Sequence, residues 1–219
     1  MSNDQKKSPP PGFYRSAVPG FILSHSYRSY VSARDRWVET LPQWSGQTII
    51  DIGCGNGETL ASYAKANRMM GYDLSPEALA EAAEIGFETF EADINALELP
   101  VGQADVVAAL NVASMASDVE AFYRQLTEAV KPGGHVLITL ATRGGLRRVT
   151  RAIITMLKVK HPAVYLPSPQ QFIDDVQASG LEVEDVTFGF SPLNGWLSKA
   201  AWARPFASFV YIKARRPLD

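Results

Sequence analysis

The chain of 219 residues is 46% hydrophobic and 20% charged, which suits one domain with a substantial core and excludes a disordered or fibrous chain. The formal net charge of −2 and the isoelectric point near 6.0 give no overall attraction to nucleic acid or to an anionic membrane, so we expect no nucleic-acid partner. The single cysteine excludes an internal disulfide framework, and neither a membrane span nor a signal peptide is recognisable, so a cytoplasmic location is predicted.

The N-terminal part of the chain falls into two segments. Residues 1–12 are polar and end in Pro-Pro-Pro-Gly, which is typical of a disordered tail. Residues 13–44 are rich in aromatic side chains, and we expect a helix over roughly 24–41. Large aromatics mainly contribute buried area, so one interpretation is that this segment packs onto the remaining domain, residues 45–219.

Residues 49–60 read Ile-Ile-Asp-Ile-Gly-Cys-Gly-Asn-Gly-Glu-Thr-Leu, an apolar strand that runs into three alternating glycines. Glycines at the end of a buried strand let the backbone turn and approach a ligand closely. The G-x-G-x-G spacing differs from the G-x-G-x-x-G/A pattern of nicotinamide and flavin sites, and no phosphate-binding GK[ST] follows. The next predicted strand, residues 69–72, ends in Asp73, where Rossmann-like sheets place a ribose-binding acid.

This motif resembles the first motif of the class I S-adenosylmethionine-dependent methyltransferases. The resemblance implies an α/β fold: a Rossmann-like, seven-stranded, mostly parallel sheet with helices on both faces and an antiparallel last strand. It implies S-adenosylmethionine as cofactor and S-adenosylhomocysteine as product. The cofactor-binding residues that follow are Asp51, Gly53, Cys54, Gly55, Gly57, Asp73, Leu74, Asp93, Ile94 and Asn111.

Within that set, Asp73 would accept hydrogen bonds from the ribose hydroxyls. Asp93 would accept a hydrogen bond from the adenine amino group, with Ile94 under the adenine ring. The alternative for Asp93 is a turn or cap carboxylate, and the alternative for Cys54 is packing. Asn111 follows the apolar strand 105–110, so residues 111–115 should face the transferred methyl group.

Alternating strands and helices predict the parallel part of the sheet. Helices are expected from the Ser75-Pro76 cap to Gly86, from a capping box at residues 117–120, and from the Ser168-Pro169 cap to Gly180. Further strands are expected at residues 87–91 and 135–141, the latter after a turn at 131–134. The last two strands, 181–190 and 206–215, should pair antiparallel because no helix fits between them.

Residues 144–158 form an amphipathic basic stretch inside a predicted insertion at about 143–167. The resembled family commonly builds its substrate wall after the fifth strand, so Arg143, Arg147 and Arg151 are candidates for binding an anionic group on a small-molecule acceptor. Solvated surface charge and a membrane-contacting helix are the alternatives.

The resemblance also implies that residues 13–44 form a cap over the cofactor and acceptor. Its candidate substrate contacts are Tyr14, Tyr27 and Tyr30. His25 or His161 could serve as a general base, and each has a structural or exposed role as its alternative. No metal-binding pattern is present, so we predict no metal.

The predicted function is methyl transfer from S-adenosylmethionine to a small-molecule acceptor, or one presented by a carrier or peptide, mainly through proximity and desolvation. The motifs of base-modifying methyltransferases are absent after the fourth strand, where the chain reads Asn-Val-Ala-Ser. The alternatives are a non-catalytic S-adenosylmethionine-binding regulatory or assembly protein and, less favoured, a nicotinamide-dependent oxidoreductase.

Overall fold

The computed structural model describes residues 20–144, 165–189 and 201–218, with the side chains of 20–29 and 201–203 left out. The predicted tail, most of the basic insertion, and Tyr14, Arg147, Arg151 and His161 therefore lie outside the described residues. So do the side chains of His25 and Tyr27.

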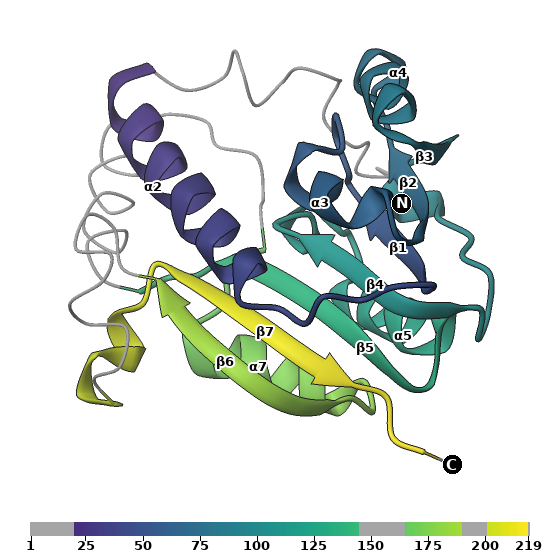
Figure 1. Cartoon of the computed structure of the whole chain (residues 1–219). Coiled ribbons are helices and arrows are strands. Elements are labelled where there is room, and N and C mark those ends of the chain that lie inside the picture. Colours follow the sequence, from purple (N-terminus) through teal and green to yellow (C-terminus); the bar gives the residue numbers. More distant parts are fainter. Residues whose placement is uncertain (1–19, 145–164, 190–200, 219) are drawn as a thin grey trace, which may run out of the picture.

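A seven-stranded sheet forms the centre of the domain, in the order β3-β2-β1-β4-β5-β7-β6 (Figure 1). The strands are β1 (Thr48–Ile52), β2 (Arg68–Asp73), β3 (Phe87–Glu91), β4 (Ala104–Leu110), β5 (Val130–Ala141), β6 (Glu182–Gly189) and β7 (Phe209–Arg215). Neighbours from β3 to β5 pair in parallel, while β7 is antiparallel to both β5 and β6. The predicted fold class, including the reversed last strand, is confirmed.

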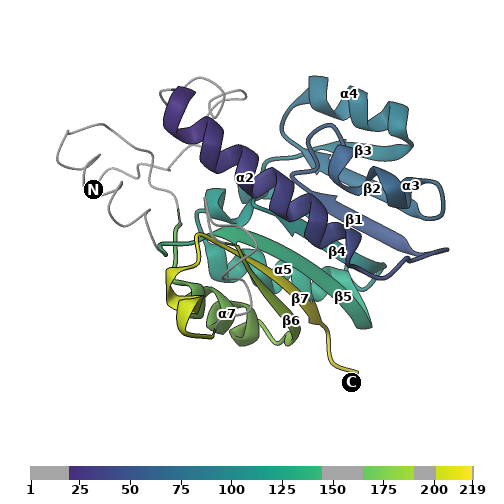
Figure 2. The same cartoon turned by 60° about the vertical axis from the view of Figure 1, so that its left-hand side comes forward.

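Helices cover both faces of the sheet (Figure 2). The α-helices are α2 (Gly20–Glu39), α3 (Ala61–Ala64), α4 (Pro76–Ile85), α5 (Val119–Ala129) and α7 (Pro169–Ala178). Short 3-10 helices are η1 (Glu58–Leu60), η2 (Ile94–Ala96), η3 (Ala113–Met115) and η4 (Ala201–Phe206). Side chains of α5 and α7 pack in one hydrophobic cluster, and those of α2, α3 and α4 pack in the other.

Strand residues alternate between the two clusters, as the two-residue period of a strand requires. Ile49 and Met69 belong to the cluster under α2, α3 and α4, whereas Ile50 and Met70 belong to the cluster under α5 and α7. Since both faces are covered, the middle parts of β1, β2 and β4 are mainly apolar.

Local signals set most helix ends. The Ser75 and Ser168 side chains accept hydrogen bonds from the amides of Ala78 and Gln171, each with proline at the first helical position, as predicted. At α5 the prediction was wrong by one residue. Asp118, not Ser117, is the N-cap and accepts from the Ala121 amide, because a carboxylate caps a helix at least as well as a hydroxyl.

Three other boundaries differ from the sequence prediction. Helix α2 spans Gly20–Glu39 instead of roughly 24–41. Strand β5 begins at Val130 instead of 135, with an irregular stretch where the partner of Ala104 is Val130 but that of Val106 is His135. The predicted turn is drawn into the sheet because the Gly133 amide donates to the Arg216 carbonyl, 2.9 Å away. The segment before β7 contains η4 where a loop was expected, and β7 starts at Phe209 instead of 206.

Strands β1 and β4 are spatial neighbours, and the chain leaves them toward opposite halves of the sheet. Such a reversal of strand order is where open parallel sheets bind ligands, beyond the carboxyl ends of the strands. The residues that follow β1, β2 and β4 therefore delimit the candidate site.

Candidate functional site

The glycine loop, residues 53–57, joins the end of β1 to η1. Gly53 has φ +69, and a Cβ there would lie 2.8 Å from Cγ2 of Val112, so the loop is pressed against the segment after β4. Gly55 has φ +54, and a Cβ there would meet nothing within 4 Å. Positive φ alone demands glycine at 55, and its open side leaves room for a ligand to approach the backbone.

Asp73, at the end of β2, is built into this loop. Its Oδ2 accepts a hydrogen bond from the Gly55 amide at 2.9 Å, and its Oδ1 accepts one from the Ser75 amide at 3.0 Å. The residue is half-buried. Each carboxylate oxygen carries two lone pairs, so the group that fixes the loop can still accept hydrogen bonds from a ligand diol.

Asp51, the third residue before Cys54, is 2% exposed. Burial raises the pKa of Asp51 to about 7, the guanidinium of Arg34 opposes this rise, and the charge of Asp73 adds to it. No hydrogen bond to the Asp51 carboxylate is found within the described segments. A buried acidic group without a donor favours a cationic or hydrogen-bonding ligand.

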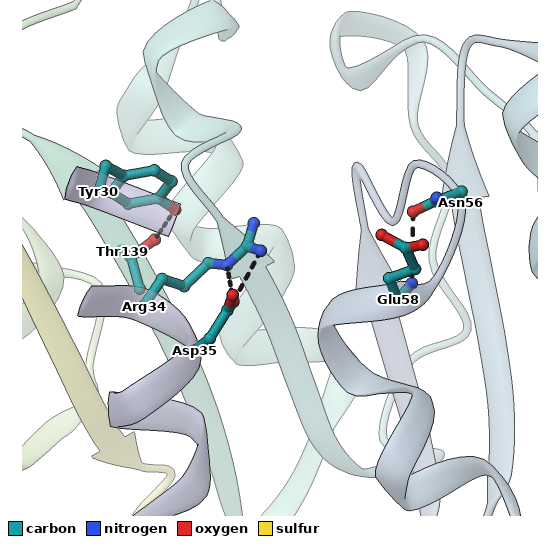
Figure 3. Close-up of polar contacts among 6 residues, drawn as sticks. All are labelled: Tyr30, Arg34, Asp35, Asn56, Glu58 and Thr139. Carbon is teal, nitrogen blue, oxygen red and sulfur yellow. Dashed lines mark hydrogen bonds and ion pairs between the residues drawn. The ribbon is translucent and has the colours of Figure 1, made fainter. Parts of the chain in front are cut away.

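Arg34 extends from α2 toward the glycine loop (Figure 3). Its side chain is only 17% exposed, forms a 2.8 Å ion pair with Asp35, and lies over the Tyr30 ring at 5.7 Å from the ring centroid. The sequence analysis missed this residue. The available signal was its spacing of four from Tyr30 and Val38, which places a cation on the buried face of the predicted helix.

The Tyr30 hydroxyl and the Thr139 Oγ1 are 2.9 Å apart, and the Tyr30 ring lies 4.8 Å from that of Phe209. At 2% exposure, Tyr30 fixes α2 against β5 and β7. This is the packing role that the sequence left as the alternative, and a substrate contact by Tyr30 stays a prediction.

Asp93 and Ile94 lie where β3 leads into η2. The Asp93 carboxylate accepts from the Asn95 amide at 2.9 Å and caps η2, as in the alternative interpretation. Ile94 lines a small cavity of about 70 Å³ together with Asn95 and Phe122. The Asn95 side-chain amide also donates to the Asp93 carboxylate, at 3.2 Å, and Asp93 is partly exposed.

Cys54 lies under the glycine loop. A Cβ at Gly71 would be 2.8 Å from its Sγ, so the thiol fills the space beside β2. Burial raises the pKa of the Cys54 thiol, which keeps it protonated and unsuited to nucleophilic attack. A cofactor contact by the Cys54 backbone stays a prediction. Leu74, beyond β2, is half-buried.

Asn111 stands at the carboxyl end of β4. Its amide donates to the Thr139 carbonyl at 2.9 Å, and its φ of +65 is the only positive value of a non-glycine residue in the parts of the chain that are described. Residues 112–115 then turn into η3. The Ser114 carbonyl accepts from the Tyr165 amide at 3.2 Å, so the end of the predicted insertion touches the segment after β4.

Of the three arginines predicted for acceptor binding, Arg143 lies in the described residues. It is exposed, and its amide donates to the Pro167 carbonyl at 2.8 Å. Over the described ranges, no helix is long and apolar enough to cross a membrane. Nor does any group of three or more His, Cys, Asp or Glu side chains in these ranges have a geometry that could hold a metal ion.

The sequence profile of the methyltransferase-domain family matches residues 24–186. The chain is 26% identical to a ubiquinone biosynthesis O-methyltransferase of Ralstonia nicotianae, over 83% of this chain and 81% of that protein. It is 31% identical to the ubiquinone biosynthesis O-methyltransferase of Methylobacterium nodulans, over 78% of this chain and 73% of that protein. A crystal structure of an S-adenosylmethionine-dependent methyltransferase from Mesorhizobium loti superposes with a TM-score of 0.64 at 21% identity, covering 84% of this chain and 98% of that one.

Proposed function

The chain belongs to the methyltransferase-domain family and is an S-adenosylmethionine-dependent methyltransferase, and on this premise we propose that it methylates a small-molecule acceptor beyond the carboxyl ends of β1, β2 and β4. The observation that carries the location is the glycine loop fixed to Asp73 through the Gly55 amide. Through that contact, the open side of the loop and the Asp73 carboxylate, which would bind the diol, lie next to each other beyond the ends of β1 and β2.

For the sugar and base of the cofactor, we propose that Asp73 accepts hydrogen bonds from the ribose hydroxyls. Asp93 would accept one from the adenine amino group, with Ile94 and Leu74 beside the adenine ring. Gly53, Cys54, Gly55 and Gly57 would contribute backbone groups. The partial exposure of the Asp73 and Asp93 carboxylates and the open side of Gly55 support this assignment.

For the amino-acid part of the cofactor, we propose an ammonium site at Asp51 and a carboxylate site at Arg34. These two side chains suit a zwitterion. The buried Asp51 carboxylate, which has no hydrogen-bond donor in the described residues, interacts electrostatically with the mostly buried Arg34 guanidinium. Guanidinium groups bind carboxylates with two parallel hydrogen bonds, which also fixes orientation.

When bound, S-adenosylmethionine supplies an electrophilic methyl group on a positively charged sulfur. The chain would hold the acceptor in line with that group and exclude water, since alignment and desolvation can supply much of the rate. The cap would contribute exclusion of water through residues 13–44. His25 or His161 as a general base stays a proposal.

The acceptor class is proposed from the names of the relatives, two of which are ubiquinone biosynthesis O-methyltransferases. We place a small aromatic acceptor beside the residues after β4, where the Ser114 carbonyl and the Tyr165 amide are hydrogen-bonded. We also propose that Arg143, Arg147 and Arg151 hold an anionic group on it, which would be seen as a raised KM with little change in kcat when Arg147 and Arg151 are replaced together.

The direct test combines binding and turnover. Isothermal titration with S-adenosylhomocysteine should give a one-to-one complex, and incubation with S-adenosylmethionine and small phenolic acceptors should release S-adenosylhomocysteine. Binding without turnover on any small acceptor would contradict the proposed acceptor class. Binding of NADH in preference to S-adenosylhomocysteine would contradict the assignment of the site.

A further inference from the structure

Asn111 combines two unfavourable features. Its backbone is in the left-handed region, at φ +65, and its side-chain oxygen Oδ1 is buried without a hydrogen-bond partner. Asparagine tolerates left-handed φ when its short amide bonds to the nearby backbone, but Oδ1 makes no such bond here. A buried hydrogen-bond acceptor without a donor destabilises the fold by about 1–3 kcal/mol, so we expect a ligand to donate a hydrogen bond to Oδ1.

The position of Asn111 narrows the choice of donor. On one side, the next residue, Val112, contacts the glycine loop, since a Cβ on Gly53 would lie 2.8 Å from its Cγ2. On the other side, the Ser114 carbonyl accepts from the Tyr165 amide, at the end of the predicted acceptor-side insertion. Asn111 thus lies between the part of the chain proposed to hold the cofactor and the part proposed to hold the acceptor.

The donors of the cofactor already have acceptors in the proposed function, on which this inference rests. The ribose hydroxyls are assigned to Asp73, the adenine amino group to Asp93, and the ammonium group to Asp51. The acceptor molecule carries an O–H or N–H group that has no assigned hydrogen-bond acceptor, and we consider it as the donor for Oδ1 of Asn111.

We propose that Asn111 positions the acceptor: its Oδ1 accepts a hydrogen bond from the hydroxyl or amine that becomes methylated, so a lone pair on that atom faces the methyl group. In the transfer, the bond from sulfur to the methyl carbon breaks as the bond from oxygen or nitrogen to that carbon forms. The amide oxygen is not a base, so the proton of the acceptor passes to the proposed general base, His25 or His161, or to water when the product leaves the site. The acceptor is therefore a protic heteroatom, not carbon.

Two substitutions separate this role from the demands of the backbone. Asn111→Gly keeps the left-handed conformation and removes Oδ1, so a purely conformational role predicts unchanged or higher stability and full activity. Asn111→Asp keeps an acceptor oxygen at the same place and should retain most of the rate. Each variant is assayed for S-adenosylhomocysteine affinity, thermal unfolding and methyl transfer.

The transfer assay uses S-adenosylmethionine with a ¹³C-labelled methyl group and, as acceptor pool, the small-molecule fraction of cells that naturally express the chain. We expect label on oxygen or nitrogen, unchanged S-adenosylhomocysteine affinity in Asn111→Gly, and a transfer rate reduced about tenfold or more, as for one lost hydrogen bond in the transition state.

Label on carbon, or an unchanged rate in Asn111→Gly, would overturn the role of Asn111 and leave the methyltransferase assignment intact. Weaker S-adenosylhomocysteine binding in Asn111→Gly would also overturn it, because Oδ1 would then serve the cofactor. If the wild type binds S-adenosylhomocysteine but labels no small molecule, the proposed acceptor class fails, and this inference fails with it.

Discussion

Replacement of Asp51 by asparagine should stabilise the protein in the absence of cofactor. Burial raises the pKa of Asp51 from 3.8 to about 7, against the opposing charge of Arg34. The shift of about three units corresponds to on the order of 4 kcal/mol of destabilisation when the carboxyl is ionised. An unpaired amide in its place costs about 1–3 kcal/mol, which leaves a net gain of about 1–3 kcal/mol at pH 8.

The gain should depend on pH in a defined direction. Between pH 4 and pH 7 the unfolded Asp51 loses its proton while the folded one keeps it, so its contribution makes wild-type stability fall as pH rises through this window. The difference between Asp51→Asn and wild type should therefore grow from pH 4 to pH 7 and level off above it.

Urea unfolding of both proteins at pH 5 and pH 8, without cofactor, measures this difference. Asp105→Asn is the matched control at the opposite end of the sheet. Burial alone would raise the pKa of Asp105, but the Lys131 ion pair and the Thr48 amide lower it overall. Its neutralisation should destabilise at pH 8. A loss of stability in Asp51→Asn at pH 8, or a difference that does not vary with pH, would refute the reasoning.

Three further substitutions test the site and its surroundings. Arg34→Ala should weaken S-adenosylhomocysteine binding about ten- to a hundredfold in calorimetry, as for lost charge-assisted hydrogen bonds, while Arg68→Ala at the amino end of β2 should not. Asp73→Ala should bind about tenfold or more weakly, because it loses both ligand acceptors and the contact to the Gly55 amide, and unchanged affinity in a folded variant would exclude the ribose role. Arg216→Ala removes hydrogen bonds to the Thr127 and Val130 carbonyls at the end of α5, so urea unfolding should show a loss of about 1–2 kcal/mol with cofactor affinity retained.

The sequence predicted those parts of the fold whose causes are local. The Ser75 and Ser168 caps act within three residues, and the alternation of apolar strands and helices implies a parallel sheet. The family resemblance, carried by the glycine spacing, supplied the expected sheet and its reversed last strand. These signals need no knowledge of distant contacts.

The features that escaped prediction depend on residues far apart in the chain. The early start of β5 follows from the bond between the Gly133 amide and Arg216, and the place of α2 from the contact between Tyr30 and Thr139, 109 residues apart. The role of Arg34 at the site also depends on residues far apart in the chain. Its position on α2 is local, but its approach to Asp51 depends on how α2 docks on the sheet.

Two residues of the proposed site depart from rules that most of the described residues obey, although the buried hydroxyl of Tyr123 on α5 also has no hydrogen-bond partner there. Asp51 is a buried carboxylate without a hydrogen-bond donor, and Asn111 has a left-handed backbone and an unpaired buried oxygen. They end adjacent strands, β1 and β4, at the reversal of strand order. Asp105 obeys the rules, since its carboxylate has both a cation and an amide donor at the opposite end of the sheet. Local violations persist where a function compensates for them. Their position at the switch point supports the proposed ligand site, and we infer that cofactor and acceptor supply hydrogen bonds to these two side chains.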